Sequence, residues 1–324
     1  MQRLIRIVKT IVGPAKRSLF RLLVSHAYRK PDRQAHRWIQ AISRRWSECQ
    51  RTGRQPRWIY EWFLDCTLAA QQDFFRRHPS NPLDLGTAPI GFEDLRIRCA
   101  TDNANSSSVY LFGRDGGQMH FHVYRRFARP GTCAIDVGAN LGMHSLVLAA
   151  CVGDGGKVHA FEPVPSIYAR MGENLELNGV TNVELHPEAL GSMRGEVVFD
   201  TNPSDFNIGK GRMKPQGDIT VPMGTLDDCL GAETLPVSMI KIDVEGHEFE
   251  VLKGGVNLME KQRPVVVMEF NPGEYTLREI RDRIPQRYAF FELAEHSEKG
   301  VKPIDNRFHH RCDLLITPYE RLQG

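Results

Sequence analysis

The sequence predicts an α/β protein with a doubly wound, mostly parallel, seven-stranded Rossmann-like sheet, an antiparallel hairpin at its C-terminal edge, and a helical N-terminal extension. From about residue 131, short β-branched runs alternate with helical stretches, a pattern typical of parallel strands covered by helices on both faces. A glycine-rich turn joins the first of these runs to a helical stretch. A polar loop without a helical pattern separates the last two runs, so we expect them to pair as a hairpin.

The regular part of the pattern defines the elements of the predicted sheet. We expect strands at 133–137, 157–161, 183–186, 238–243, 265–270, 288–293 and 312–317. We expect helices at 141–151, 166–178, 246–260 and 275–285. Shorter strands are expected around 95–98 and 109–112, after a linker rich in proline, asparagine and glycine from His78 to Pro89. The chain is therefore expected to divide into an extension, 1–90, and a domain, 91–324.

The extension differs in charge from the rest of the chain. Residues 1–60 contain fifteen Lys or Arg and two acids, whereas the remainder contains 42 − 15 = 27 basic and 39 − 2 = 37 acidic residues. An apolar stripe in residues 1–25, broken at Gly13-Pro14, indicates an amphipathic helix. Such a stripe usually packs on its own domain or on a second subunit; the alternative is peripheral contact with an anionic membrane surface. The four tryptophans, all within 33–78, are expected in a core.

Composition excludes several classes of protein. The chain is 41% apolar and 25% charged, as in soluble globular proteins. Its seven cysteines are odd in number and contain no Cys-x-x-Cys pair, so we expect neither a disulfide framework nor a structural zinc site. Charges interrupt every apolar run in residues 1–30, so no secretory signal or membrane span is expected. These features favour a protein of the cytoplasm. The alternative location is peripheral attachment to the inner face of a membrane.

A ligand-binding loop is predicted after the first strand. The strand ending at Asp136 runs directly into Val137-Gly138-Ala139-Asn140-Leu141-Gly142 and then a helix. Glycines at these positions let the backbone turn tightly and approach a ligand closely. No Gly-Lys-Ser/Thr follows, so a phosphate-binding Walker loop is not supported.

The residues around this loop narrow the ligand. Glu162 lies 162 − 142 = 20 residues past Gly142, at the end of the second strand, where a carboxylate can accept both ribose hydroxyls of an adenosine cofactor. This leaves NAD and S-adenosylmethionine open. Asn140 stands where a dinucleotide fingerprint prefers glycine, and Asp136 suits the ammonium of a methionine moiety but would repel a pyrophosphate. These two residues favour S-adenosylmethionine over NAD as the cofactor.

Five ordered motifs carry a resemblance to a known family. They are Ile135–Gly142, His159–Pro163, Glu188–Gly191, Thr225–Asp227 and Ile240–Glu248. Together they resemble the FkbM family of S-adenosylmethionine-dependent methyltransferases, over about residues 125–270. The resemblance implies methyl transfer to a hydroxyl oxygen, often of a sugar or polyketide-like product, without a metal. The residues expected to contact the cofactor are Asp136, Gly138, Ala139, Asn140, Gly142, Glu162 and Ala189.

Catalytic candidates follow the fourth and fifth strands. Asp243 is the first choice for contact with the substrate hydroxyl or the methionine moiety, although it could instead cap the next helix. His247 is the best general base by intrinsic pKa, and Glu245 could orient either residue. Glu269, which ends the fifth strand, is a second candidate base. Lys241, in a buried strand, is expected to pair with an acid.

Acceptor choice is expected to depend on the polar loop 200–218. Asn202, Ser204, Asp205 and Asn207 could bond sugar hydroxyls, or the loop could simply be solvated. The predicted acceptor is a hydroxyl of a sugar, glycan or natural product. The sequence makes nucleic acid an unlikely partner.

Two rival functions remain. A ribose 2′-O-methyltransferase acting on RNA would fit the basic extension, but the lysine that such enzymes carry after the fifth strand is absent from Phe270–Gly273. A non-catalytic membrane-surface module with a degenerate methyltransferase body is the other. The intact cofactor motifs argue against it.

Overall fold

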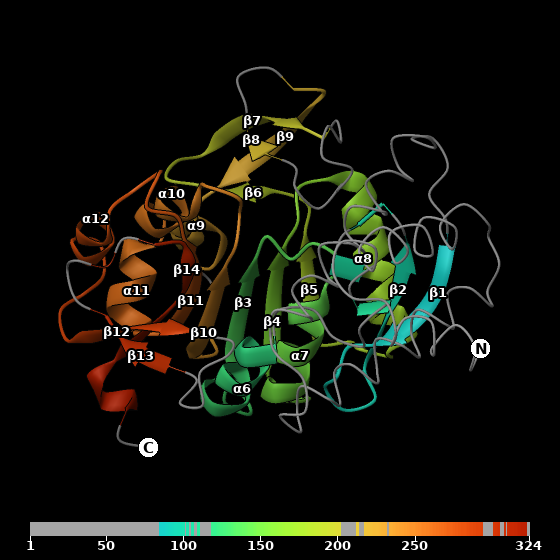
Figure 1. Ribbon diagram of the computed structural model, residues 1–324, viewed down its shortest axis with the longest axis horizontal. Coiled ribbons are helices and arrows are strands. Elements are labelled where there is room, and N and C mark those ends of the chain that lie inside the picture. Colours follow the sequence, from blue (N-terminus) through green and yellow to red (C-terminus); the bar gives the residue numbers. More distant parts are fainter. Residues whose placement is uncertain are drawn as a thin grey trace, which may run out of the picture. The chain divides into compact units, whose positions relative to one another are not determined.

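The computed structural model (Figure 1) describes residues 84–100, 102–103, 105–106, 109–110, 118–201, 212–213, 217–231, 233–293, 301–304, 308 and 310–322. The predicted helical extension, with its apolar stripe and its four tryptophans, lies outside the described residues, apart from the few residues after 83. Asn202, Ser204, Asp205 and Asn207 also lie outside them. No helix in the described part of the chain is both long and apolar enough to cross a membrane.

The chain divides into two units. The first contains residues 1–89, 98–115 and 204–207, and the second contains 90–97, 116–203 and 208–324. The predicted boundary at residue 90 stays a prediction. All of the candidate site residues named above, other than those in the undescribed loop, belong to the second unit.

The described residues before 116 correct two expectations. The linker prediction is wrong at β1 (Asp84–Pro89), which forms a two-stranded sheet with β2 (Arg96–Ala100), the strand expected around 95–98. The strand prediction at 109–112 is wrong at Val109 and Tyr110, which are helical. A capping interaction explains the difference, because the Asn103 side chain accepts a hydrogen bond from the Ser106 N–H at 2.9 Å and so favours a helical start.

The main sheet of the second unit has the order β13-β12-β14-β11-β10-β3-β4-β5. Its five parallel strands are β3 (Cys133–Val137), β4 (Lys157–Phe161), β5 (Val183–His186), β10 (Val237–Ile242) and β11 (Val265–Phe270). The three antiparallel strands are β12 (Tyr288–Leu293), β13 (Val301–Pro303) and β14 (Cys312–Pro318). The parallel body and the antiparallel C-terminal pair are confirmed. The count of seven is wrong, because β13 adds an eighth strand at the edge.

The strand order reverses beside β3. This strand pairs in parallel with β4 on one side and with β10 on the other, so the chain leaves β3 in one direction and returns on the opposite flank. The loops after β3 and β10 therefore diverge from the same end of the sheet. Ligands of open α/β sheets bind at such a switch point.

Helices cover this sheet, some of them at predicted positions, whereas those at 118–127 and 226–229 were not predicted and the one expected at 275–285 is shorter. They are α6 (Gln118–Phe127), α7 (Met143–Val152), α8 (Pro165–Leu177), α9 (Leu226–Cys229), α10 (Glu248–Lys253), α11 (Val256–Gln262), α12 (Leu277–Arg281) and the 3-10 turn η2 (Tyr319–Arg321). The single helix expected at 246–260 is instead split into α10 and α11. The break falls at Gly254 and Gly255, where a Cβ on Gly254 would lie 2.0 Å from the carbonyl oxygen of Gly191. Close packing on that segment separates the two helices.

A second, smaller sheet was not predicted. Its order is β6-β9-β7-β8, formed by β6 (Ala189–Leu190), β7 (Gly195–Asp200), β8 (Arg212–Met213) and β9 (Ile219–Gly224). Figure 1 shows it at the top of the view, beyond the ends of β3 and β4. Its buried side chains Phe199 and Val221 form an apolar cluster with Leu141, which belongs to the glycine-rich loop, and with Val164, which follows β4. This sheet therefore packs at the ligand-binding end of the main sheet.

Candidate functional site

The loop between β3 and α7 has an unusual backbone. Gly138, Asn140 and Gly142 have φ values of +76°, +51° and +82°, in the left-handed region that favours glycine. A Cβ on Gly138 would lie 1.9 Å from the carbonyl oxygen of Asp243. The loop can therefore pack directly against the end of β10 only because residue 138 has no side chain.

A buried ion pair between Lys241 and Asp136 holds this loop in place. The Lys241 ammonium lies 3.1 Å from Oδ1 of Asp136, and the two side chains are only 4% and 0% exposed. Ser145 donates a hydrogen bond to Oδ2 of Asp136 at 2.5 Å, and Lys241 donates another to the Gly138 carbonyl at 2.7 Å. The predicted pairing of Lys241 with an acid is confirmed. A direct contact between Asp136 and a ligand ammonium would require this pair to open.

Glu162 supports the loop from the end of β4. Its Oε2 accepts a hydrogen bond from the Asn140 N–H at 2.9 Å, and its Oε1 accepts one from the Val164 N–H at 3.0 Å. Burial raises the pKa of Glu162 to about 7, although these two hydrogen bonds oppose the increase. Each carboxylate oxygen has capacity for a further hydrogen bond. A vicinal diol such as a ribose supplies two matching donors.

The remaining predicted cofactor residues lie around this loop. The backbone N–H groups of Gly138 and Ala139 donate to the Phe161 carbonyl at 3.0 and 2.9 Å, which joins the loop to the end of β4. Ala189 is buried in β6 and belongs to the apolar cluster that includes Leu141. The seven predicted residues thus frame one end of the sheet, at its switch point. Their binding roles stay predictions.

The turn after β10 is shaped by a residue that the sequence analysis did not single out. Buried Glu248 accepts hydrogen bonds at Oε1 from the backbone N–H groups of Val244 and Gly246, at 3.0 and 3.1 Å. The Tyr275 hydroxyl lies 2.9 Å from the other oxygen of Glu248. Glu245, which lies between Val244 and Gly246 in the chain, has a left-handed φ of +53°. Glu248 therefore fixes the tight turn that presents Asp243 and Glu245.

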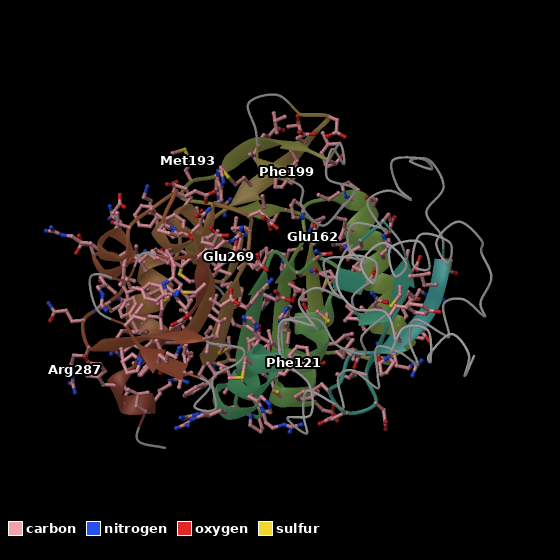
Figure 2. The ribbon with its side chains drawn as sticks, in the orientation of Figure 1. Phe121, Glu162, Met193, Phe199, Glu269 and Arg287 are labelled. Atoms are coloured by element: carbon pink, nitrogen blue, oxygen red, sulfur yellow. The ribbon has the colours of Figure 1, made fainter. Side chains whose placement is uncertain are left out.

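Glu269 lies at the end of β11, on the same rim of the sheet as Glu162 (Figure 2). The Arg311 guanidinium donates to its Oε1 through Nε at 2.8 Å and Nη2 at 2.5 Å. Burial raises the pKa of Glu269 to about 7; repulsion by Asp243 and Glu245 adds to the increase, while Arg311 opposes it. A carboxyl group with this pKa can take up a proton near neutrality.

The structure brings some of the catalytic candidates together. Carboxylate oxygens of Asp243, Glu248 and Glu269 all lie within 4.8 Å of one another. Asp243 does not cap the following helix, because His247 holds the N-cap position of α10. Hydrogen bonds from Lys253 and Ser192, together with the nearby His247, lower the pKa of Glu250 against the effect of burial. Asp243 and Glu269 therefore form one group with Glu248, and His247 is not a member of it.

This group of carboxylates suits hydroxyl groups better than a metal ion. Glu248 already accepts two backbone hydrogen bonds and contacts Tyr275, and Glu269 is paired with Arg311. Asp243, whose side chain is half exposed, has its nearest cation, Lys241, at 3.9 Å. Asp243 and Glu269 thus offer hydrogen-bond acceptors to an incoming donor. Arg311 and Tyr275 had no local signal in the sequence that pointed to this site.

The chain is similar in sequence to known methyltransferases. The sequence profile described as the methyltransferase FkbM domain matches residues 136–292. A hexuronic acid methyltransferase, AglP of Haloferax volcanii, is 32% identical over 133 residues, which cover 41% of this chain and 53% of the relative. The 2-O-methyltransferase NoeI of Sinorhizobium fredii is 24% identical over 207 residues, covering 57% of this chain and 82% of the relative. The chain therefore spans about half of the first relative's length.

A solved structure of similar type is methyltransferase FkbM from Methylobacillus flagellatus. It is 15% identical to this chain, with a TM-score of 0.39, and the match covers 64% of this chain and 52% of that one.

Proposed function

We propose that this chain, whose residues 136–292 form an S-adenosylmethionine-dependent methyltransferase domain of the FkbM family, transfers a methyl group to a hydroxyl oxygen of a carbohydrate. The observation that carries the proposal is Glu269, a carboxyl group with a pKa near 7 beside Asp243 at the rim of the sheet. The names of two relatives, a hexuronic acid methyltransferase and a 2-O-methyltransferase, support a sugar hydroxyl as the acceptor.

The residues at the switch point fit the cofactor. Glu162 has free acceptor capacity for two ribose hydroxyls, and the loop from Gly138 to Gly142 brings backbone rather than side chains toward the ligand. We assign Ala139 and Asn140 to the same contact surface, with Ala189 beside them. We assign Asp136 an indirect role, because it holds Lys241, which in turn holds the Gly138 carbonyl. The bound cofactor supplies an electrophilic methyl group on a sulfonium, so the protein mainly has to position the acceptor.

An alcohol needs help to act as a nucleophile at neutral pH, since its hydroxyl is barely ionised. We assign Glu269 as the general base that accepts the hydroxyl proton during attack. Asp243 accepts a hydrogen bond from the same or a neighbouring hydroxyl and so orients the acceptor. Glu245 raises the proton affinity of Glu269 through charge repulsion. His247 is the rival base.

The charge of the site favours a hydroxyl-rich acceptor. Asp243 and Glu269, when ionised, can accept further hydrogen bonds beside the contacts that they already make. Sugars supply several donors at fixed spacing, and a polar acceptor compensates for the loss of water around carboxylates. A phenolic or thiol acceptor offers one donor.

The experiment is a transfer assay with a labelled methyl donor and purified full-length chain. The acceptor panel contains glucuronic and galacturonic acids, neutral hexoses, oligosaccharides, a catechol and a random RNA. We expect label in a carbohydrate as an alkali-stable ether, and a loss of roughly 100-fold or more in turnover in Glu269→Gln. Exclusive labelling of the RNA or the catechol would overturn the proposal.

A further inference from the structure

Two histidines and a glutamate meet on strands β4 and β5. The parallel register places His159 opposite Glu184 and Phe161 opposite His186, so His159 and His186 project from the same face. Nδ1 of His159 lies 3.0 Å from Nε2 of His186. Oε2 of Glu184 lies 3.9 Å from the His159 nitrogen, and its Oε1 lies 3.9 Å from the His186 nitrogen. None of these side chains belongs to the proposed methyl-transfer site.

We propose that His159, His186 and Glu184 form a zinc-binding site with three protein ligands and an open fourth position. Zinc bonds of about 2.0–2.2 Å at tetrahedral angles place neighbouring ligand atoms about 3.3 Å apart. The two histidine nitrogens are 3.0 Å apart, slightly closer than that value, and each lies 3.9 Å from a different oxygen of Glu184, so either oxygen has to approach the ion. The Glu184 side chain is half exposed, so it can move inward by the few tenths of an ångström that bonding needs. This site goes beyond the proposed methyl transfer and differs from the sequence-based expectation of no metal.

A fourth residue supports the site from behind. Oε2 of Glu233 lies 2.7 Å from Nε2 of His159, and both side chains are almost completely enclosed. Oε1 of Glu233 accepts a hydrogen bond from the Leu235 N–H at 2.8 Å, which fixes the carboxylate. This contact holds the proton of His159 on Nε2 and leaves the lone pair of Nδ1 pointing toward His186. A carboxylate bonded to the far nitrogen of a histidine is the usual outer partner of a zinc ligand.

Two interactions oppose metal binding. With the His159 proton on Nε2, the Nε2–H of His186 is the donor of the hydrogen bond to His159 when no metal is bound, and metal binding exchanges this hydrogen bond for two metal bonds. The Lys157 ammonium, which is 3.3 Å from Oε2 of Glu184, competes for the same carboxylate. Removing Lys157 should therefore tighten binding, whereas removing the Glu184 charge should weaken it. The two substitutions should therefore change the metal affinity in opposite directions. Because both side chains are exposed, this test does not disturb the core.

Another arrangement of the same histidine is less favourable. Cys133, His159 and Glu233 also come within 4.8 Å of one another, on the Nε2 side of the ring. Cys133 is fully buried in the apolar core of the second unit, so an ion there would have no open position for water. Glu233 would also lose its hydrogen bond to His159. We therefore assign the ion to the Nδ1 side.

The experiment measures metal binding by the full-length chain, without substrate. Zinc affinity is measured by calorimetry, and cobalt is titrated while visible absorption is recorded, since tetrahedral cobalt gives intense bands. Relative to wild type, we expect Glu184→Gln to bind at least roughly tenfold more weakly, Lys157→Met to bind more tightly, and Glu233→Gln to bind roughly 10- to 100-fold more weakly. His310→Gln, which changes an exposed histidine paired with Glu292, serves as the control and should be unchanged.

Three results would overturn the site. One is no zinc binding by wild type at about 1 mM. Another is unchanged affinity in both Glu184→Gln and Lys157→Met. The third is loss of binding in Glu269→Gln but not in Glu184→Gln, which would place the ion at the acidic rim instead. Because binding is read without methyl donor or acceptor, its failure leaves the proposed methyl transfer untouched, and a failure of methyl transfer leaves this test intact.

Discussion

The ammonium of Lys241 lies 3.1 Å from the carboxylate of Asp136, although neither side chain is exposed to solvent beyond 4%. Removing one partner of such a pair leaves the other charge buried without compensation, a loss of about 3–5 kcal/mol in the free energy of unfolding. We expect Lys241→Met to lose about that much in denaturant unfolding. The double variant Lys241→Met/Asp136→Asn should recover a large part of it. Equal losses in the single and double variants would contradict a direct pair.

The contact between Gly138 and the Asp243 carbonyl predicts a steric effect. Gly138→Ala places a Cβ 1.9 Å from that oxygen, in addition to the cost of about 1–2 kcal/mol for a left-handed alanine. Gly179→Ala is the control, because its φ of +63° is similar but its Cβ would meet nothing within 4 Å. Thermal unfolding should show a larger loss in Gly138→Ala, and calorimetry should show weaker binding of S-adenosylhomocysteine. Equal losses in the two variants would argue against the clash.

The raised pKa of Glu162 predicts a pH-dependent cofactor affinity. Only the ionised carboxylate can accept two hydroxyl hydrogen bonds while keeping those from Asn140 and Val164, so binding should strengthen as pH rises through about 7. With a pKa near 7, the ionised fraction, and with it the apparent affinity for S-adenosylhomocysteine, changes by about tenfold between pH 6 and pH 8. Glu162→Gln should bind more weakly at pH 8 and lose this dependence. Glu176→Gln, at an exposed position of α8, should keep it.

The same shift affects stability in the opposite direction. The folded protein holds a proton on Glu162 up to about pH 7, whereas the unfolded chain releases it near the ordinary value of 4.5. Stability without ligand should therefore fall as pH rises from about 4.5 to 7. In Glu162→Gln this contribution disappears, so the difference between variant and wild type, followed by denaturant unfolding, should change across that window. A constant difference would contradict the raised pKa.

The pairing of Glu269 with Arg311 predicts the pH profile of catalysis. Arg311 lowers the pKa of Glu269, so Arg311→Met should raise that pKa further. If Glu269 is the base, the acid limb of the kcat profile lies near pH 7 in wild type and moves to higher pH in Arg311→Met. Glu269→Gln should lose most turnover while retaining cofactor affinity. A limb that moves in His247→Gln but not in Arg311→Met would assign the base to His247 instead.

The sequence predicted those parts of the fold in which local and long-range preferences agree. The strands β3, β4, β5, β11 and β12 have the predicted bounds, because each is a short β-branched or aromatic run flanked by turn residues. The small sheet was missed because two of its strands, Ala189–Leu190 and Arg212–Met213, have only two residues each and no readable alternation. Their strand conformation depends on partners outside the local sequence: Ala189 pairs with Met223, and Arg212 pairs with Asp200. The break at Gly254 likewise depends on a distant contact, with Gly191.

In the candidate site, too, some contacts could be predicted from the local sequence, whereas others depend on distant residues. The loop from Gly138 to Gly142 and its partner Glu162 are close in sequence to a strand–turn–helix pattern, so their meeting could be predicted. Glu269 and Arg311 are 42 residues apart, and their pairing depends on the position of β14 beside β11 in the sheet. No local sequence pattern predicts that position. Glu248 was visible only as part of a motif, and its role in fixing the turn needed coordinates.

The position of β14 has a consequence for synthesis of the chain. In the sheet this strand lies between β11 and β12, although both are translated before it. A nascent chain that has completed β12 therefore contains the strands that carry the proposed cofactor residues, while β11 still lacks its neighbour on the side away from β10 and Glu269 lacks Arg311. Until β14 emerges, β11 presents an apolar edge to which another nascent chain can pair. Cofactor binding can thus precede catalytic competence on the ribosome, and the interval between them is a period of exposure to aggregation.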